Sequence, residues 1–268
     1  MLCRPMSLAP MSEPDLNIEK QVFRPLIVVA HPDDEVIGCG ILLQRLKDVT
    51  VTFLTDGAPA DRYFWEKFGS RTRYVELRAG ETQCALSRLK YVRTTRLGVR
   101  DQELAFHLDV AFEWLREAVS EADPDSIITH AYEGGHPDHD CCSFLCSLVS
   151  HEFGIPVWEM PLYSRAGGKL VRQHLPQGAS TTCLSASDKE ARCKAEMVAA
   201  YASQSDFLQT FDLTTEKFSP QPRHDYSRPP HEGKLNYECW GWEITGGDLC
   251  AAFARLIEKN HMQRAKSA

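Results

Sequence analysis

The sequence lacks the long single-character runs of membrane and nucleic-acid-binding proteins. None of its 268 residues lies in an apolar stretch approaching the roughly 18 residues that a membrane span needs. It also has no run of five or more Lys and Arg residues, and its formal net charge is −7. An acidic chain without a basic cluster is a poor electrostatic match for nucleic acid. We therefore expect neither a membrane span nor a nucleic-acid partner.

The N-terminal residues show no continuous apolar segment and no clear cleavage site of the kind that marks a secretory signal. We expect a cytoplasmic protein with a flexible tail over residues 1–22, followed by a single domain over 23–268. Met1 and Met11 both remain candidate starts.

Ten cysteines are present, but their pattern does not favour a disulfide framework. The chain is large, and several cysteines fall inside helical or apolar patterns, so free thiols are the better interpretation. Cys141, Cys142 and Cys146 cluster, yet no second pair stands at zinc-finger spacing, which favours small buried side chains over a metal site. Ser203 lies outside any G-x-S-x-G elbow, and "GCGILLQ" is an incomplete dinucleotide fingerprint.

Apolar runs alternate with helical periodicity through the first 161 residues. Strands are predicted at 25–30, 49–55, 91–98, 126–131 and 155–161, and helices at 34–48, 70–89, 105–122, 138–154 and 188–204. Such alternation is typical of βαβ units. The fold class that it predicts is α/β, a Rossmann-like three-layer sandwich with a mostly parallel central sheet. Residues 219–243, rich in Pro, His and aromatics, are predicted to form irregular C-terminal loops over one edge of the domain.

Two His-Pro-Asp motifs, "AHPDDE" (30–35) and "GGHPDHD" (134–140), each follow a predicted strand. Loops after parallel strands meet at one edge of the sheet, where α/β proteins place their sites. His31 and Asp34 from the first motif and an imidazole from the second would make three metal ligands with an open position for water, as a catalytic zinc requires. Asp33 and His136 would then lie beside the metal, suited to proton transfer. Helix capping is the alternative for either motif alone, because carboxylates favour helix N-termini, but capping does not explain the pair.

The two motifs in this order resemble the PIG-L/LmbE-type family of metal-dependent N-deacetylases. Two weaker similarities accompany them: "RAGETQCALSRL" (78–89) and "AAYASQSDFL" (199–208). The resemblance runs from about residue 26 to 208. Family members remove an acetyl or another acyl group from an amine, commonly on an N-acetylglucosamine-type sugar.

The resemblance implies a role for seven residues. It makes His31, Asp34 and His139 the ligands of one Zn²⁺ per chain, with Fe²⁺ left open as the ion in the cell. Asp33 becomes the general base, and His136 stabilises the oxyanion. Arg78 and, more loosely, Asp101 would bind substrate.

The function expected from these features is metal-dependent removal of an N-acetyl group from an amino sugar or a sugar-containing metabolite. Two alternatives stay open: an amidase for a larger conjugate such as a thiol S-conjugate, and a carbohydrate-binding relative without catalysis. An intact Asp33 argues against the latter, since binding alone needs no base. The substrate's identity and the oligomeric state are not encoded in any motif.

Overall fold

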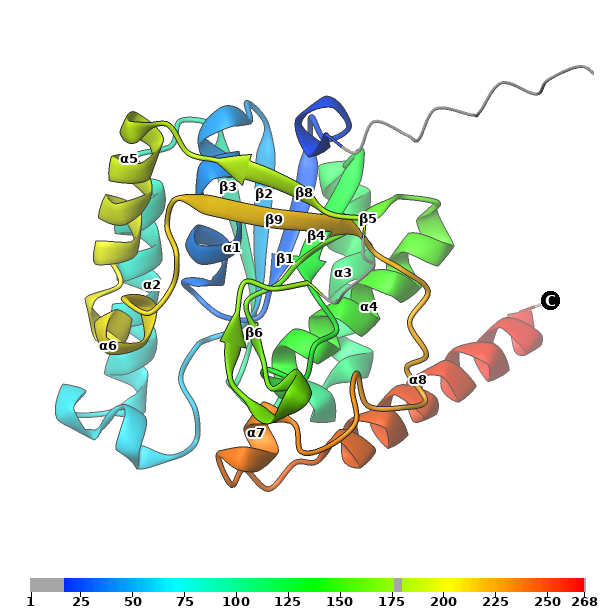
Figure 1. The fold of residues 1–268 in the computed structure, drawn as a ribbon. Helices are drawn as coiled ribbons and strands as arrows, with labels where there is room; N and C mark the ends of the chain where they lie inside the picture. The colour runs from blue at the N-terminus through cyan, green and yellow to red at the C-terminus, as the bar shows by residue number, and fades with distance from the viewer. Residues whose placement is uncertain (1–16, 176–179, 268) are drawn as a thin grey trace, which may run out of the picture.

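A seven-stranded sheet forms the centre of the computed structural model, which describes residues 17–175 and 180–267 (Figure 1). The strand order is β3-β2-β1-β4-β5-β9-β8. Strands β1 to β5 are parallel, whereas β9 and β8 add to the sheet in antiparallel fashion. The strands are β1 Pro25–Val29, β2 Val49–Thr55, β3 Val92–Val99, β4 Ser126–His130, β5 Val157–Met160, β8 Thr182–Ser185 and β9 Thr215–Pro220, with β6 Tyr163–Ser164 and β7 Val171–Arg172 as a separate pair.

Helices pack on both faces of this sheet, which completes the three layers (Figure 1). They are α1 Asp34–Arg45, α2 Arg71–Leu86, α3 Leu108–Ala122, α4 Pro137–Phe153, α5 Asp188–Ala199, α6 Ser205–Leu208, α7 Asn236–Cys239 and α8 Gly246–Ser267. Short 3₁₀ turns are η1 Ile18–Lys20, η2 Arg62–Phe64, η3 Glu66–Phe68, η4 Leu104–Phe106, η5 Ala166–Gly168 and η6 Ala202–Gln204. No helix in these two described ranges is both long and apolar enough to cross a bilayer.

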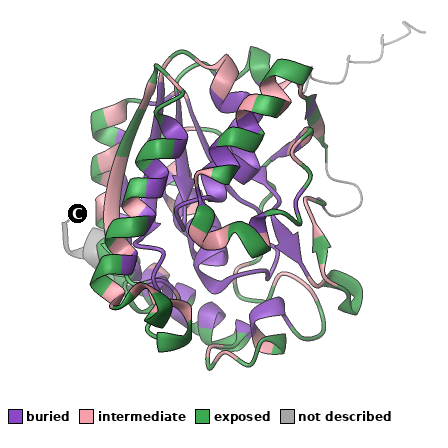
Figure 2. Ribbon diagram, turned by 90° about the vertical axis from the view of Figure 1, so that its left-hand side faces the viewer, coloured by how far each residue is buried: buried purple, intermediate pink, exposed green. Residues whose placement is uncertain are grey.

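The core has two halves because the pleat of each strand sends alternate side chains to opposite faces. In β1, Ile27 and Val29 pack with α1 and α5, while Leu26 and Val28 pack with α3, α4 and α8. All five residues of β1 are buried, as its uninterrupted apolar sequence predicts (Figure 2). The parallel α/β class predicted from the sequence is confirmed.

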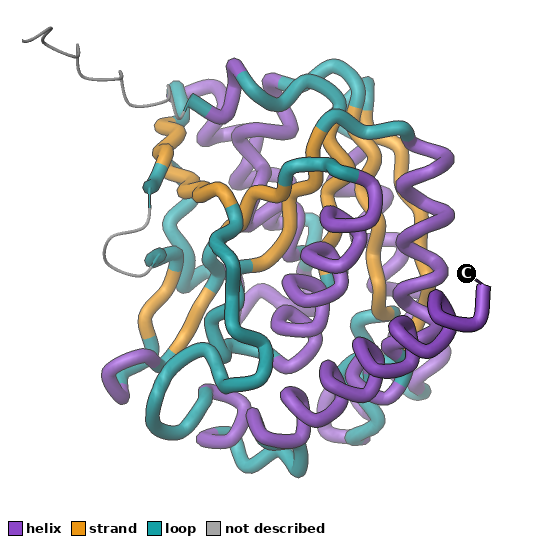
Figure 3. The backbone as a smooth tube through the Cα atoms, turned by 90° about the vertical axis from the view of Figure 1, so that its right-hand side faces the viewer, coloured by secondary structure: helices purple, strands orange, loops and turns teal. Residues whose placement is uncertain are grey.

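The chain ends contain the main differences from the predicted elements. Ile18 and Val22 are fully buried, so the packed body begins before residue 23, and residues 1–16 of the predicted tail lie outside the described residues. No element is predicted after residue 243, yet α8 runs along the α3–α4 face (Figure 3). The predicted loop region is irregular over 221–235, but residues 219–220 belong to β9.

The nine cysteines within the described ranges are free thiols. Cys141, Cys142 and Cys146 are buried in the core between α4 and the sheet, as small apolar residues would be. No cysteine belongs to a candidate metal-binding group in that part of the chain.

Candidate metal centre and active site

Both His-Pro-Asp loops emerge at the point where the strand order changes direction. One follows β1 and the other follows β4, and these two strands are neighbours in the sheet. Successive connections from β1 and β4 leave in opposite directions, which opens a crevice between the loops. The topology therefore brings together two motifs that are about a hundred residues apart in the sequence.

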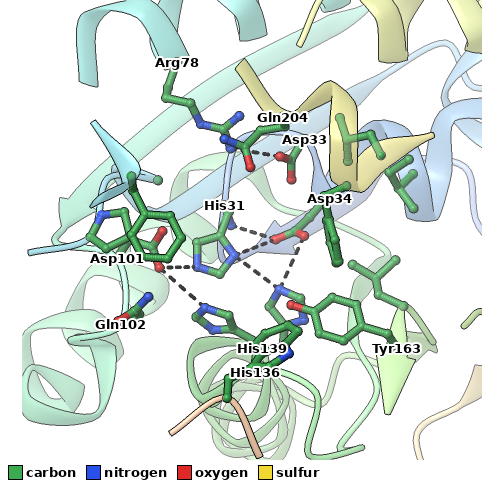
Figure 4. A pocket seen from close by; sticks show the side chains of 18 of the residues that line it. His31, Asp33, Asp34, Arg78, Asp101, Gln102, His136, His139, Tyr163 and Gln204 are labelled. Atoms are coloured by element: carbon green, nitrogen blue, oxygen red, sulfur yellow. Dashed lines mark hydrogen bonds and ion pairs between the residues drawn. The ribbon is translucent and has the colours of Figure 1, made fainter. Parts of the chain in front are cut away.

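His31, Asp34 and His139 converge in this crevice (Figure 4). The Nδ1 atom of His31 lies 3.2 Å from Nε2 of His139 and 3.3 Å from Oδ2 of Asp34, while Nε2 of His139 lies 3.3 Å from Oδ1 of Asp34. A tetrahedral zinc with bonds of about 2.0–2.1 Å separates its ligand atoms by about 3.3–3.4 Å. The spacing and chemistry of these three donors fit such an ion.

The same region offers other groupings of possible metal donors. In the described residues they are His31, His136 and His139; His31, Asp101, His136 and Asp138; and Asp34, His130 and His139. All of them share residues with the convergent trio, and the second also includes the carboxylates of Asp101 and Asp138. The Nε2 side of His31 faces two carboxylates, Asp101 at 3.0 Å and Asp138 at 3.3 Å.

Those two carboxylates determine how the His31 ring is protonated. Burial disfavours its charge, but Asp101, Asp138 and Asp34 outweigh burial and raise the pKa of His31 well above its ordinary value. Without a metal this raised pKa favours the doubly protonated, charged ring. A metal ion bound at Nδ1 would displace the Nδ1 proton, while the Nε2 proton stays with the two carboxylates. A carboxylate behind a ligating imidazole is the usual support of a protein metal site.

Asp34 and His139 hold the charge states that ligands need. Burial alone would raise the pKa of Asp34, but His139 and His130 outweigh it and hold that pKa well below its usual range. Burial lowers the pKa of His139, which favours the neutral ring. His130 stacks on His139 with ring centroids 3.9 Å apart, and its Nε2 accepts the backbone N–H of Ala30 at 3.0 Å. The stacking makes His130 a support for the imidazole ring of His139.

Asp33 stands at the N-cap of α1 with φ of 111°, a left-handed conformation that is costly for a residue other than glycine. Its side chain does not cap the helix. Instead Oδ2 accepts a hydrogen bond of 2.9 Å from Nη2 of Arg78. Burial raises the pKa of Asp33, Arg78 opposes that shift, and Asp34 adds to it, which leaves the pKa at about 6. A carboxyl with this pKa ionises near neutral pH, as a general base must.

His136 lies beside the trio as the N-cap of α4. Its Nδ1 accepts the backbone N–H of Asp138 at 3.1 Å, so the neutral ring carries its proton on Nε2, which lies 3.5 Å from Asp101. Burial and the nearby rings of His31 and His139 lower the pKa of His136 well below its ordinary value. The ring therefore offers an N–H donor without carrying a charge.

Arg78 and Asp101, predicted to bind substrate, both line the cavity but already have protein partners. Arg78 donates to Asp33 and to the carbonyl of Pro32, and its side chain is 3% exposed. Glu81, one turn along α2, lies 3.7 Å from Nη1 of Arg78 and accepts hydrogen bonds from Ser203. The two weaker sequence similarities, in 78–89 and 199–208, thus meet around Arg78.

A cavity of about 430 Å³ opens onto these groups. Its lining includes the seven predicted site residues, together with Pro59, Phe64 and Tyr74 from the segment after β2 and Trp240 and Trp242 from the predicted C-terminal loop region. Gly57 permits the close approach of the turn after β2, since a Cβ there would lie 2.7 Å from Pro32. His224, in the predicted C-terminal loop region, pairs with Glu159 at 2.6 Å and does not line the cavity.

Sequence reasoning missed Asp138 and Tyr163. Asp138 is fully buried and accepts the backbone N–H groups of Gln102 and Leu104 besides facing His31. Tyr163 follows β5, the strand next to β4, and its ring lies 5.5 Å from that of His139. The sequence signal for Tyr163 was its position just past β5, the next parallel strand. Gly135 makes room for it, because a Cβ there would clash with the Tyr163 carbonyl at 2.0 Å.

The PIG-L family model, described as GlcNAc-PI de-N-acetylase, matches residues 26–149, the segment with both His-Pro-Asp loops and Arg78. Over this segment the chain is similar to the PIG-L family. A Bacillus cereus protein, the probable N-acetyl-alpha-D-glucosaminyl L-malate deacetylase 2, is 31% identical over 143 residues. That match covers 51% of this chain and 64% of the relative, somewhat less than two thirds of its length.

Two solved structures share the fold. A deacetylase from the teicoplanin biosynthesis pathway has a TM-score of 0.60 at 20% identity, over 75% of this chain and 99% of its own. The N,N'-diacetylchitobiose deacetylase of Pyrococcus horikoshii has a TM-score of 0.57 at 19% identity, over 78% of this chain and 87% of its own. At these identities the likeness extends to the fold alone.

Proposed function

We propose that this protein is a metal-dependent hydrolase that removes the N-acyl group, acetyl in the simplest case, from an amino sugar or a sugar-containing metabolite. The observation that carries the proposal is the convergence of His31, Asp34 and His139 beside a strained, buried Asp33. Three relatives support the same class by their names: a probable N-acetyl-alpha-D-glucosaminyl L-malate deacetylase, a deacetylase from the teicoplanin biosynthesis pathway and an N,N'-diacetylchitobiose deacetylase.

In this proposal His31, Asp34 and His139 hold one zinc ion. When bound, zinc would lower the pKa of a water molecule to about 7 and polarise the acyl carbonyl. The chain's part is to present one carboxylate and two imidazoles, of which His31 would give up its Nδ1 proton to the ion, and to keep them rigid. Asp101 and Asp138 behind His31, and His130 behind His139, supply that rigidity.

Asp33 takes the proton from the attacking water, whose oxygen forms the new bond to the acyl carbon. The hydrogen bond from Arg78 keeps the carboxylate oriented toward the cavity while burial keeps it basic. When the C–N bond breaks, the electron pair stays on nitrogen, and the proton held by Asp33 is delivered to the leaving amine. His136 donates Nε2–H to the oxyanion that develops on the carbonyl oxygen.

Acetate release from N-acetylglucosamine, free, nucleotide-linked and glycoside-linked, tests the proposal. We expect release by the purified protein, loss of release after chelation, and recovery on addition of one equivalent of Zn²⁺. Anaerobic reconstitution with Fe²⁺ in parallel compares the two candidate ions. If the zinc-loaded protein binds these sugars but releases no acetate, the hydrolase proposal is wrong and a binding protein is favoured.

A further inference from the structure

Part of the cavity lining next to the proposed ligands is apolar. It is formed by Ile37, Leu162, Phe207, Leu208 and Phe211, which we call the apolar arm. Ile37 lies one turn beyond Asp34 on α1, Leu162 follows β5, and Phe207 and Leu208 belong to α6. The arm therefore begins directly beside the proposed metal ligands.

The arm is a built surface. Ile37 and Leu162 are 1% exposed and Leu208 is 2% exposed. The rings of Phe207 and Phe211 pack against each other at 5.3 Å, and Phe207 packs against Tyr163 at 5.4 Å. These contacts fix the side chains of the arm next to Tyr163.

Arg172 braces the two phenylalanines. Its guanidinium lies 5.6 Å from the ring of Phe211 and 5.9 Å from that of Phe207, while Arg172 itself does not line the cavity.

The opposite side of the site is polar. Asp101 and Gln102 lie across His31 from Tyr163, and Asp33 and Arg78 lie above (Figure 4). An amide held at the ligands has two substituents that leave in different directions. The amine fragment of a sugar carries hydroxyl groups and needs the polar side. The acyl group is then directed into the apolar arm.

We propose that the protein hydrolyses N-acyl groups longer than acetyl, with the acyl chain in the apolar arm. This inference rests on the proposed hydrolase function and specifies its substrate class. All five side chains of the arm line the cavity, and an acetyl methyl is too small to contact more than part of that apolar lining. The chemical class that fits is a medium-length aliphatic or aromatic acyl amide of an amino sugar.

The test is a kcat/KM series on N-acetyl, N-butyryl, N-hexanoyl and N-phenylacetyl glucosamine, read as released glucosamine. Each buried methylene contributes about 0.8 kcal/mol, or about fourfold, at most. We expect N-hexanoyl glucosamine to exceed the N-acetyl compound by at least about tenfold in kcat/KM. A series that is best with acetyl and falls with length overturns the apolar arm as an acyl site while leaving the hydrolase intact. If none of the compounds is cleaved, the hydrolase proposal fails and takes this inference with it.

An alkyl glycoside of N-acetylglucosamine separates the acyl group from the aglycone. If an octyl aglycone raises kcat/KM as much as we expect for the acyl series, and a longer acyl chain does not raise it, the arm holds the aglycone. The proposal is then wrong.

Two variants move the preference in opposite directions. Leu208→Trp fills the arm and is expected to lower the hexanoyl-to-acetyl ratio of kcat/KM at least tenfold. Phe211→Leu widens the arm and is expected to move the optimum to a longer chain. Phe64→Leu makes the same exchange in the loop after β2, which contributes no residue to the arm, and should leave the optimum where it is. Equal shifts in Phe211→Leu and Phe64→Leu would contradict the placement.

Discussion

The two His-Pro-Asp loops differ in where the helix begins. In the first loop α1 starts at Asp34, with Asp33 as the N-cap, whereas in the second loop α4 starts at Pro137, with His136 as the N-cap. The same letters are therefore shifted by two residues relative to their helices. As a result the first histidine, His31, lies with the other two proposed ligands, Asp34 and His139. Its counterpart His136 caps a helix through Nδ1.

The third position of the motif shows the consequence most clearly. Asp33 is held in a left-handed conformation, lines the cavity and keeps one hydrogen bond to Arg78. Asp138 is fully buried and accepts two backbone N–H groups while supporting His31. One aspartate is poised for chemistry and the other is structural. Only the fourth position, Asp34 and His139, has the same proposed role in both loops, that of a metal ligand.

Asp33→Asn tests the aspartate that we propose as the general base. We expect metal binding to be retained and kcat to fall at least about a hundredfold, the usual scale of a general base, because an amide cannot take the proton. Acetate release and metal content measured on the same sample check this. Full turnover by the variant would show that Asp33 is not the base.

The pair His139→Ala and His136→Ala separates a ligand from a helix cap. His139→Ala should weaken zinc binding by more than the about 10–100-fold that loss of an outer-shell partner costs, since a ligand itself is removed. His136→Ala should keep the zinc affinity within that range while lowering kcat. Competition with a metallochromic chelator measures both affinities. Unchanged zinc affinity in His139→Ala would contradict the ligand set.

Asp138→Asn tests the structural member. One backbone N–H loses its acceptor, so we expect a loss of about 1–3 kcal/mol in the free energy of unfolding, measured in urea without metal. Zinc affinity should fall about 10–100-fold through the lost support of His31. Asp33→Asn, measured in the same way, should change the unfolding free energy far less. Equal losses in the two variants would remove the distinction between the aspartates.

Glu133, just before the second loop, predicts a small dependence of stability on pH. Its Oε1 accepts the backbone N–H groups of Leu162 and Tyr163. Burial raises its pKa from about 4.5 to about 8, against the opposing effect of those hydrogen bonds. Between these values the folded protein binds more protons than the unfolded chain, so this group's contribution to stability is lost as pH rises.

Glu133→Gln keeps an acceptor oxygen and removes the titration. The variant's Tm relative to the wild type should therefore rise from pH 5 to pH 8, with each 1 kcal/mol worth about 2–4 °C. Calorimetry at several pH values measures this difference in Tm. Glu117→Gln is the control, because Glu117 is an exposed residue of α3. A constant difference in Tm across this range would contradict the raised pKa.

Local sequence signals account for most of the fold. The apolar run of β1, the Ser70 cap of α2 and the Ser187 capping box of α5 are all visible as short patterns, and each element forms where its pattern stands. The antiparallel strands β8 and β9 were missed because they are short, and their positions depend on pairing with the edge of β5. Helix α8 was missed as well. Its buried residues Leu249, Ala252, Phe253 and Leu256 recur at helical spacing, so a local signal was present, whereas its packing against α3 and α4 is a tertiary contact.

By itself the sequence determined the α/β class and the two loops that carry the chemistry, because strand and helix periodicity and the His-Pro-Asp spacing are local properties. Tertiary structure decided which aspartate stays free, since the two-residue shift in helix start is set by how each loop packs. It also placed Arg78 on Asp33, Asp138 behind His31, and an apolar arm beside the ligands. Those contacts join residues that are far apart in the sequence, and only the folded sheet with its helices brings them within reach.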